Sequence, residues 1–208
     1  LAASHARLDF IINNACQTVR RPPAFYAHMM ESETAARLDM PAHVRALLGE
    51  WSSNRTTTVA QAGTALPIAD APRLSQVPLL PEDLASSPVL FPTGHLDQDL
   101  QQVDLRDRNS WRLLLAEVSS VEVLEVQLVN AVAPFVLNAR LKPLMLRTPE
   151  RDKHIVNVSA MEGQFYRIAK TTRHPHTNMA KAALNMMTRT AATDYYNDGI
   201  HMNAVDTG

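Results

Sequence analysis

The sequence predicts an α/β fold built on a parallel sheet, and three observations near its end support this prediction. Residues 155–159 form a short apolar run that is typical of a buried strand. Residues 178–196 form a long segment with apolar side chains at helical spacing. Residues 200–205 form a second short apolar run. A helix between two buried strands is the crossover unit of a parallel sheet, because parallel strands need a long connection.

Length, composition and charge narrow the classes to which this protein can belong. Its 208 residues suffice for one domain with a hydrophobic core. The net charge of −1 gives no electrostatic reason to expect nucleic acid or an anionic membrane as a partner. A single cysteine excludes an internal disulfide framework, as is typical of a reducing, intracellular compartment. We expect no transmembrane segment, because no apolar run reaches the necessary length.

The first predicted element is a strand within residues 8–15, an apolar run that closes in two asparagines and a turn. Residues 22–109 then change in character. Residues 25–51 look mostly helical, with a break at Pro41. Residues 52–93 contain six of the thirteen prolines and no sustained periodicity, which predicts a long irregular segment. We therefore interpret residues 22–109 as a large surface insertion.

A second long helix is predicted at residues 119–147. Ser119 or Ser120 fits the N-cap position, and Pro134 should kink the helix because proline lacks the N–H donor. The segment is apolar on more than one side, so we expect it to be buried or shared with another subunit.

Five motifs follow these elements in a characteristic order. The first predicted strand ends in Asn-Asn-Ala-Cys, and a lone asparagine lies in the helix at 119–147. The strand at 155–159 ends in Asn-Val-Ser-Ala, a lysine opens the last helix, and the chain ends in Asn-Ala-Val-Asp-Thr-Gly. The set resembles the short-chain dehydrogenase/reductase family, which has Asn-Asn-Ala-Gly, Asn-x-Ser-Ser and Asn-Ala-Val-x-Pro-Gly at these places.

The resemblance implies a Rossmann-like, doubly wound parallel sheet, of which residues 1–208 form the later part. They would make a single partial domain with an insertion at about residues 22–109. Residues 8–15 then correspond to the family's fourth strand. The glycine-rich turn that binds the pyrophosphate would precede Leu1, since the chain contains no Gly-x-Gly-x-x-Gly. The chain does not begin with methionine, which agrees with the expectation that further residues precede Leu1.

The resemblance also implies four catalytic positions, of which two are changed. Asn130 stands where the family has an active-site asparagine, and Lys181 stands where it has the lysine that holds the ribose. Thr177 replaces the tyrosine four residues before this lysine, and an aliphatic hydroxyl is a poor proton donor. Ala160 occupies the place of the catalytic serine, and Ser159 that of the structural one.

Other side chains could take over the proton transfer. Tyr166 could act with Lys170, as a second Tyr-x-x-x-Lys, or could reach Lys181 from the loop. His174 and His176 are a further alternative, because histidine titrates near neutrality. Exposed loop histidines are the simpler interpretation. We expect no metal site, since two histidines without a third ligand are weak evidence.

The resemblance implies NAD or NADP as the cofactor, contacted at two turns of this chain. After the first strand, Asn14, Ala15 and Cys16 would pass close to the dinucleotide. Cys16 replaces a glycine and so adds a Cβ where the family keeps the backbone bare. At the other turn, Asp206, Thr207 and Gly208 would lie beside the nicotinamide, with Lys181 on its ribose.

Two functions follow as hypotheses. The first is a divergent NAD(P)-dependent oxidoreductase that acts on a carbonyl or alcohol substrate. The alternative is an inactive member that serves as a binding or assembly component and presents residues 22–109 to a protein partner. By resemblance, the helices at 119–147 and 177–196 would form a homo-oligomer interface, although core packing explains their apolar stripes equally well.

Overall fold

The computed structural model describes residues 5–34, 40–43, 75–84, 89–92, 94–98, 101–166 and 170–207. The chain divides into two compact units. One combines Leu1–Arg20 with Arg108–Gly208, and the other is Arg21–Asp107. The second unit covers nearly the range of the predicted insertion.

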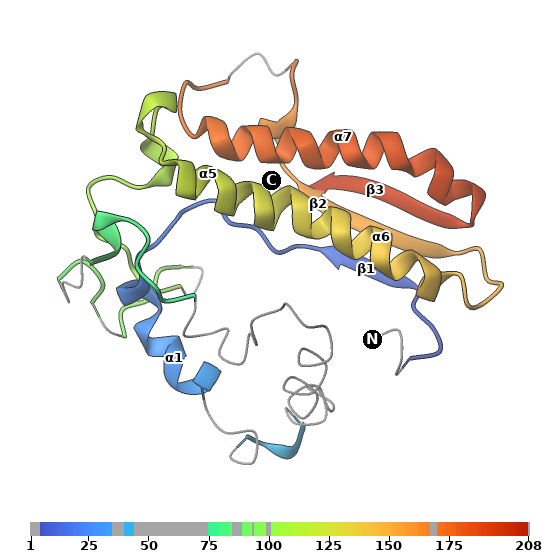
Figure 1. The fold of residues 1–208 in the computed structure, drawn as a ribbon, viewed down its shortest axis with the longest axis horizontal. Helices are drawn as coiled ribbons and strands as arrows, with labels where there is room; N and C mark the ends of the chain where they lie inside the picture. Colours follow the sequence, from blue (N-terminus) through green and yellow to red (C-terminus); the bar gives the residue numbers. More distant parts are fainter. Residues whose placement is uncertain are drawn as a thin grey trace, which may run out of the picture. The chain divides into compact units, whose positions relative to one another are not determined.

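A three-stranded parallel sheet forms the centre of the first unit (Figure 1). Its strands are β1 (Phe10–Asn13), β2 (Lys153–Ser159) and β3 (Ile200–Asp206), in the order β1-β2-β3. Asn13 lies opposite Asn157 in the β1–β2 pairing, and Ser159 lies opposite Asp206 in the β2–β3 pairing. The parallel strands and their helical crossovers confirm the predicted α/β, Rossmann-like fold.

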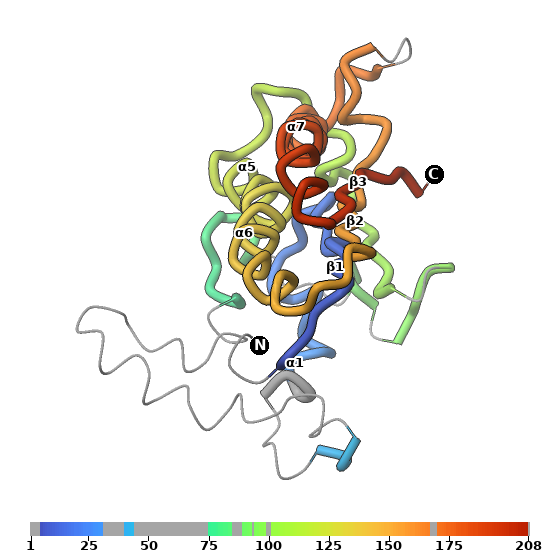
Figure 2. Tube along the Cα trace, turned by 90° about the vertical axis from the view of Figure 1, so that its right-hand side faces the viewer, coloured from blue at the N-terminus to red at the C-terminus, as the bar shows by residue number. Residues whose placement is uncertain are grey.

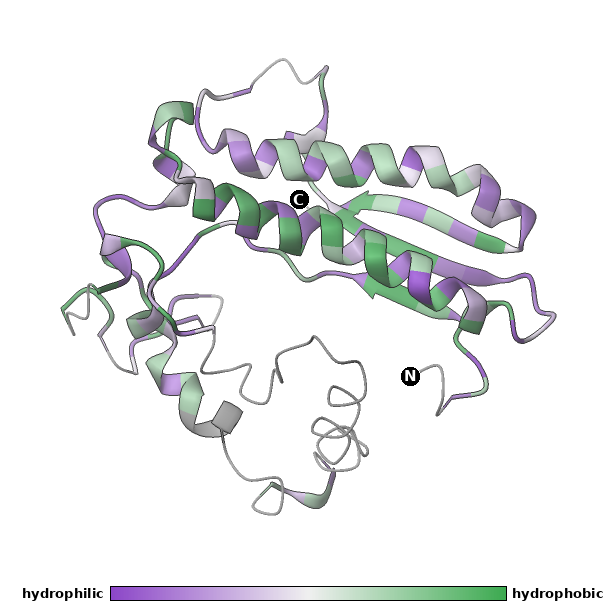
Figure 3. Cartoon of the chain, in the orientation of Figure 1, coloured by the Kyte–Doolittle hydropathy of each residue, from purple (hydrophilic) through white to green (hydrophobic). Residues whose placement is uncertain are grey.

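The helices of this unit lie together on one side of the sheet (Figure 2). They are α5 (Ser120–Gln127), α6 (Ala133–Met145) and α7 (Pro175–Asn197). Every second residue of β2 is buried toward them, whereas Phe10 and Ile12 of β1 are 64% and 68% exposed. The core cluster consists of apolar side chains from the strands and the helix ends: Ile11, Met145, Ile155, Tyr195, Ile200 and Met202. Figure 3 shows the apolar strands beneath the helices.

A π-helical turn, η6 (Leu128–Val132), joins α5 to α6 where a kink at Pro134 was predicted. Ser119 caps α5 by accepting the Glu122 N–H at 3.1 Å. Proline has no N–H for the carbonyl four residues before it, which is Asn130. The Ala133 N–H instead bonds Leu128, five residues back. The helix thus accommodates the missing donor by widening one turn.

The combined helix Ser120–Met145 is long and apolar enough to cross a membrane by length and composition, with 22% of its apolar window buried. The expectation that no stretch reaches this length is therefore wrong. A core helix of a protein outside the membrane satisfies the same two criteria. Within this helix Asn130 and Asn138 are buried and hydrogen-bonded to other segments of the unit.

Four polar side chains join the sheet to both long helices. Asn13 Nδ2 donates to Asn138 Oδ1 at 2.9 Å and to Asn157 Oδ1 at 2.8 Å. Asn157 Nδ2 donates to Thr188 Oγ1 at 3.0 Å, and Thr188 donates to the Leu184 carbonyl at 2.9 Å. We call Asn13, Asn138, Asn157 and Thr188 the central polar cluster. Its members are nearly inaccessible and mutually bonded, as buried polar groups must be.

The unit Arg21–Asp107 contains short helical elements and a small group of packed aromatic rings. Its helical elements are η1 (Pro23–Tyr26), α1 (Ala27–Thr34) and η3 (Pro81–Leu84). The Phe25 and Phe91 rings meet edge to face at 5.8 Å, and the Arg21 guanidinium lies 4.3 Å over the Phe25 ring. Helix α1 covers part of the predicted helix at 25–51, of which residues 35–39 and 44–51 lie outside the described residues. So does most of the predicted irregular segment, at 52–74, 85–88 and 93.

Candidate functional site

The carboxyl ends of all three parallel strands meet at one edge of the sheet. In open α/β sheets, ligands bind at this edge. Asn14, Ala15 and Cys16 follow β1 here and are exposed. Asp206 and Thr207, at the end of β3, are exposed as well, and Gly208 lies outside the described residues. The fold therefore brings the two predicted cofactor-binding turns to the same edge.

Asn130 holds the loop that follows β1. Its Oδ1 accepts the Gln17 N–H and its Nδ2 donates to the Gln17 carbonyl, both at 2.7 Å. Asn130 is 1% exposed and lies in the π-helical turn. An amide that satisfies both backbone groups of one residue fixes the position of that residue, so Asn130 defines the path of the loop at Cys16–Gln17.

Lys181 lies in the second turn of α7 with its ammonium group against the end of β2. Its Nζ donates to the Val158 carbonyl at 2.9 Å, and the residue is 4% exposed. An ammonium has three N–H donors, and this bond uses one of them. The adjoining turn η7 (Met161–Gly163) packs tightly on the helix, since a Cβ at Gly163 would lie 2.6 Å from the Lys181 carbonyl carbon. Lys181 is thus enclosed between the strand end and η7.

Thr177 and Ser159 carry buried hydroxyl groups near this edge. Thr177 lies one helical turn before Lys181 and is 3% exposed, and Ser159 ends β2 and is 7% exposed. Neither hydroxyl oxygen has a hydrogen-bond partner within the described part of the chain. An unsatisfied buried polar group is uncommon in a native structure and often marks a functional site.

Tyr166 does not join this group. Its side chain is 97% exposed and follows Phe165, which is 77% exposed. Lys170 donates to the Glu162 carbonyl and is exposed as well. Residues 167–169 lie outside the described residues. The structure therefore gathers Asn130, Lys181, Thr177 and Ser159 near the carboxyl edge, and leaves Tyr166 directed toward solvent.

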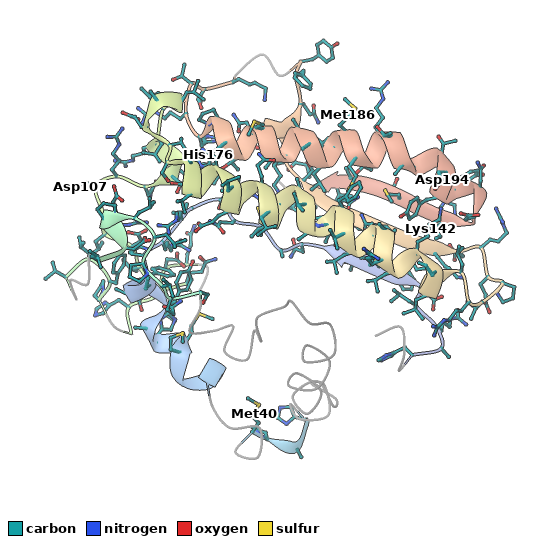
Figure 4. The ribbon with its side chains drawn as sticks, in the orientation of Figure 1. Met40, Asp107, Lys142, His176, Met186 and Asp194 are labelled. Carbon is teal, nitrogen blue, oxygen red and sulfur yellow. The ribbon has the colours of Figure 1, made fainter. Side chains whose placement is uncertain are left out.

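The interpretation of His174 and His176 as exposed loop histidines is wrong, since His174 is half-buried and His176 is buried in the first turn of α7. Neither belongs to a metal cluster of the described residues. His176 is 3% exposed, with Nε2 3.2 Å from Glu122 Oε1 (Figure 4). His174 is the N-cap of α7 at φ 42°, with its ring 4.6 Å from the Trp111 ring. Burial lowers the pKa of His174, although a hydrogen bond with Asn178 acts against this. In the described segments no three His, Cys, Asp or Glu side chains could hold a metal ion.

Glu122 is a buried carboxylate that sequence reasoning missed. Burial raises its pKa, but the neighbouring His176 and Ser110 side chains favour the ionised carboxylate and outweigh burial, so that the net shift of the pKa is downward. Ser119-x-x-Glu122 has the pattern of a helical capping box, which predicts a local contact rather than one with residue 176. Glu125, which bonds Gln17 Nε2 at 3.1 Å, was also missed. Its only sequence signal is an acidic residue on an otherwise apolar helix.

Comparison with known proteins gives partial matches. Residues 109–208 match the family described as enoyl-(acyl carrier protein) reductase. An uncharacterized protein of Acanthamoeba polyphaga mimivirus is 36% identical over 96 residues, which are 46% of this chain and 20% of that protein. The chain thus spans about one fifth of the curated relative that it matches.

The solved structures to which the chain is similar over less than half of its length include three oxidoreductases. The carbonyl reductase from chicken fatty liver, solved with NADPH, is 24% identical, with 46% of this chain and 41% of that chain covered and a TM-score of 0.42. The Drosophila melanogaster carbonyl reductase Sniffer is 23% identical, with 46% and 42% covered and a TM-score of 0.42. A short-chain dehydrogenase/reductase from Brucella ovis is 28% identical, with 48% and 42% covered and a TM-score of 0.37.

Proposed function

We propose that residues 109–208 are the divergent C-terminal part of a short-chain dehydrogenase/reductase domain, and that the whole protein is an NAD(P)-dependent oxidoreductase. Its substrate would be a carbonyl compound or the corresponding alcohol. The observation that carries the proposal is Lys181. A buried ammonium group at the carboxyl edge of a parallel sheet is expensive to keep unless it has anionic or polar partners.

The residues at this edge fit the nicotinamide half of a dinucleotide. The residues at the ends of β1 and β3 are exposed at the same edge of the sheet, and Lys181 has N–H donors beyond the one that it gives to Val158. Lys181 would bind the ribose, and Asn130 would keep the neighbouring loop in place through Gln17. The bound cofactor would supply or accept the hydride. The pyrophosphate needs a glycine-rich turn, which this sequence does not contain.

Proton transfer would have to proceed without the usual phenol. Thr177 lies at the position of that phenol and Ser159 at the end of β2, and both hydroxyls are oriented within the buried layer. An aliphatic hydroxyl can pass a proton through a hydrogen bond but cannot hold the negative charge near neutral pH. We therefore propose slow turnover, in which Thr177 gives its hydroxyl proton to the substrate oxygen while its own oxygen takes up a proton from solvent, so that no alkoxide is left on Thr177.

Cofactor titration of the full-length protein tests the proposal. Lys181→Met removes a charge-assisted hydrogen bond and should weaken NAD(P)H binding by about ten- to a hundredfold. Lys142→Met is the matched control, because Lys142 pairs with Asp194 and Asp198 at the far ends of α6 and α7. Equal affinity in the wild type and the Lys181→Met protein would refute the proposal. Cofactor binding without turnover of any carbonyl substrate would favour the inactive binding component.

We further propose that the protein is a homo-oligomer through its long helices. The outer side of the α5–α6 helix carries large exposed apolar side chains, of which Leu124 is 69%, Leu128 58% and Phe135 60% exposed. Met179 and Met186 of α7 are 51% and 55% exposed. Apolar surface of this kind marks association sites. Leu128→Glu should convert the oligomer to a monomer in analytical ultracentrifugation, and a wild-type monomer would contradict this proposal.

A further inference from the structure

A series of polar contacts connects the two sides of the candidate site. It begins at Gln17, in the loop after β1, and ends at His176, in the first turn of α7. Between them lie side chains from that loop, from the short helix η4 (Ser110–Arg112) and from α5. We call the whole set the connecting network; its members are Gln17, Arg20, Ser110, Glu122, Glu125 and His176.

The half of the network nearer to β1 holds the loop to helix α5. One carboxylate oxygen, Glu125 Oε2, accepts from Gln17 Nε2 at 3.1 Å and from Arg20 Nε at 2.9 Å. The Arg20 side chain is only 12% exposed, so its ion pair with Glu125 is screened less than one on the surface. Together with the bonds from Asn130, these contacts determine where residues 14–20 lie.

The other half of the network reaches the start of α7. The Ser110 hydroxyl accepts the Arg20 backbone N–H at 2.8 Å and donates to the Glu122 carboxylate. Glu122 in turn faces His176 at 3.2 Å, and the two side chains are 8% and 2% exposed. A buried carboxylate is stable only when its partners remain in place, so displacement of one partner affects the others.

The first turn of α7 depends on such contacts because its own cap is weak. Its N-cap residue, His174, gives no side-chain cap and has a left-handed backbone, which is unfavourable for a residue with a Cβ. The turn is instead held by contacts with other segments. The His174 N–H donates to the Leu113 carbonyl at 2.9 Å, and His176 Nε2 lies 3.2 Å from Glu122 Oε1. Thr177 directly follows His176, and Lys181 lies one turn further.

From these contacts we infer that the connecting network is a positioning device, which couples the loop at residues 14–20 to the first turn of α7. A shift of His176 is transmitted through Glu122, Ser110 and Arg20 to the loop, so the two sides of the site move together. Arg20 is the last residue before the unit Arg21–Asp107, and Ser110 follows that unit closely. The bond between them therefore joins the segments that lead into and out of the insertion. The inference does not depend on the proposed activity.

Hydrogen exchange of the whole chain, followed by mass spectrometry, tests the coupling. His176→Gln should speed amide exchange at residues 174–181 and also at residues 14–20, by about two- to thirtyfold. In a Ser110→Ala background, His176→Gln should still speed amide exchange at residues 174–181. Its effect at 14–20 should fall below about twofold, because the link between the two halves is gone.

Asp194→Asn is the matched control, since it breaks the 2.6 Å ion pair with Lys142 at the opposite ends of the same helices (Figure 4). It should leave exchange unchanged in both segments. If circular dichroism shows that His176→Gln is unfolded, Glu122→Gln replaces it, because this variant keeps the shape of the side chain. An unchanged rate at 14–20 in the wild-type background would overturn the inference, and so would equal responses with and without the Ser110 hydroxyl.

Discussion

The buried polar groups at the centre of the sheet differ from those at its carboxyl edge. In the central polar cluster, Asn13, Asn138 and Asn157 share hydrogen bonds of 2.8–3.3 Å, and Thr188 completes the set. At the carboxyl edge, the hydroxyls of Ser159 and Thr177 have no partner in the described residues. The two regions share their elements, since Asn157 and Ser159 belong to the same strand and Thr177 and Thr188 to the same helix.

We infer that the difference separates a structural role at the centre of the sheet from the functional role that we propose for its carboxyl edge. A fully bonded buried network stabilises one packing of the sheet against its helices and has no capacity left for a ligand. Unpaired buried hydroxyls cost stability, and a fold keeps them where a ligand or substrate satisfies them. The same argument explains why Lys153, which is fully buried, is structural: its ammonium bonds the carbonyls of Met145 and Thr148 at the end of α6.

The largest effect is expected from a break in the central polar cluster. Asn157→Ala removes the acceptor for Asn13 and Asn138 and the donor to Thr188, which leaves several buried groups unsatisfied. We expect the free energy of unfolding to fall by about 3–5 kcal/mol. Urea denaturation followed by circular dichroism measures the loss.

Asn203→Ala provides the control for this prediction, because Asn203 is an exposed residue of the neighbouring strand β3. Asn203→Ala should change the free energy of unfolding by no more than about 0.5 kcal/mol. A loss of similar size in the two variants would show that the central polar cluster is not what stabilises the sheet.

The sequence predicted the strands and helices that carry these polar groups, but not all of the hydrogen-bond partners. The apolar runs and the helical periodicity predicted β2, α7 and β3 closely, because each pattern is local. Asn13, Asn130 and Lys181 were found through their place in short motifs. Asn138 was missed, since its partners Asn13 and Asn157 are 125 and 19 residues away and a lone asparagine in a helix carries no local signal. Asn130 and Asn138 are eight residues apart, about two helical turns, which is the one pattern that could have indicated a shared face.

The next largest effect should come from overpacking beside Lys181. A Cβ at Gly163 would lie 2.6–2.8 Å from the backbone of Lys181 and the side chain of Asn185, so Gly163→Ala must push η7 away from α7. We expect a loss of about 1–3 kcal/mol in the free energy of unfolding. Gly94→Ala is a control without a clash, although its left-handed φ of 80° costs about 1 kcal/mol. Equal losses would mean that η7 is not packed closely on the helix.

A pair of identical substitutions on α7 tests the comparison itself. Thr188→Val removes a hydroxyl that bonds both Asn157 and Leu184, and it should cost about 1–3 kcal/mol. Thr177→Val removes a buried hydroxyl without a partner in the described residues, so it should leave stability unchanged or raise it, by up to about 1–3 kcal/mol. Thermal and urea unfolding give both values. The distinction fails if Thr177→Val destabilises the protein as much as Thr188→Val does.

The smallest effect is expected at Glu122, and it appears only in acid. Because the folded chain holds the pKa of Glu122 below its usual value, the ionised carboxylate stabilises the fold at any pH above its pKa in the unfolded chain. This contribution is lost as the pH falls through the lower, folded pKa. The partners that must keep their places are His176, Ser110 and the more distant Arg20.

Glu122→Gln isolates this contribution, because glutamine keeps the shape but cannot ionise. Above about pH 6 the stabilities of wild type and variant should run parallel, since the carboxylate is ionised in both the folded and the unfolded chain. Below about pH 5 the wild type should lose stability faster than Glu122→Gln, because the unfolded carboxylate begins to take up protons first. Urea unfolding in steps of pH from about 7 to 3 measures both curves. Curves that remain parallel over the whole range would mean that the partners of Glu122 do not outweigh its burial. The carboxylate would then belong with the poorly satisfied groups of the edge rather than with a bonded network.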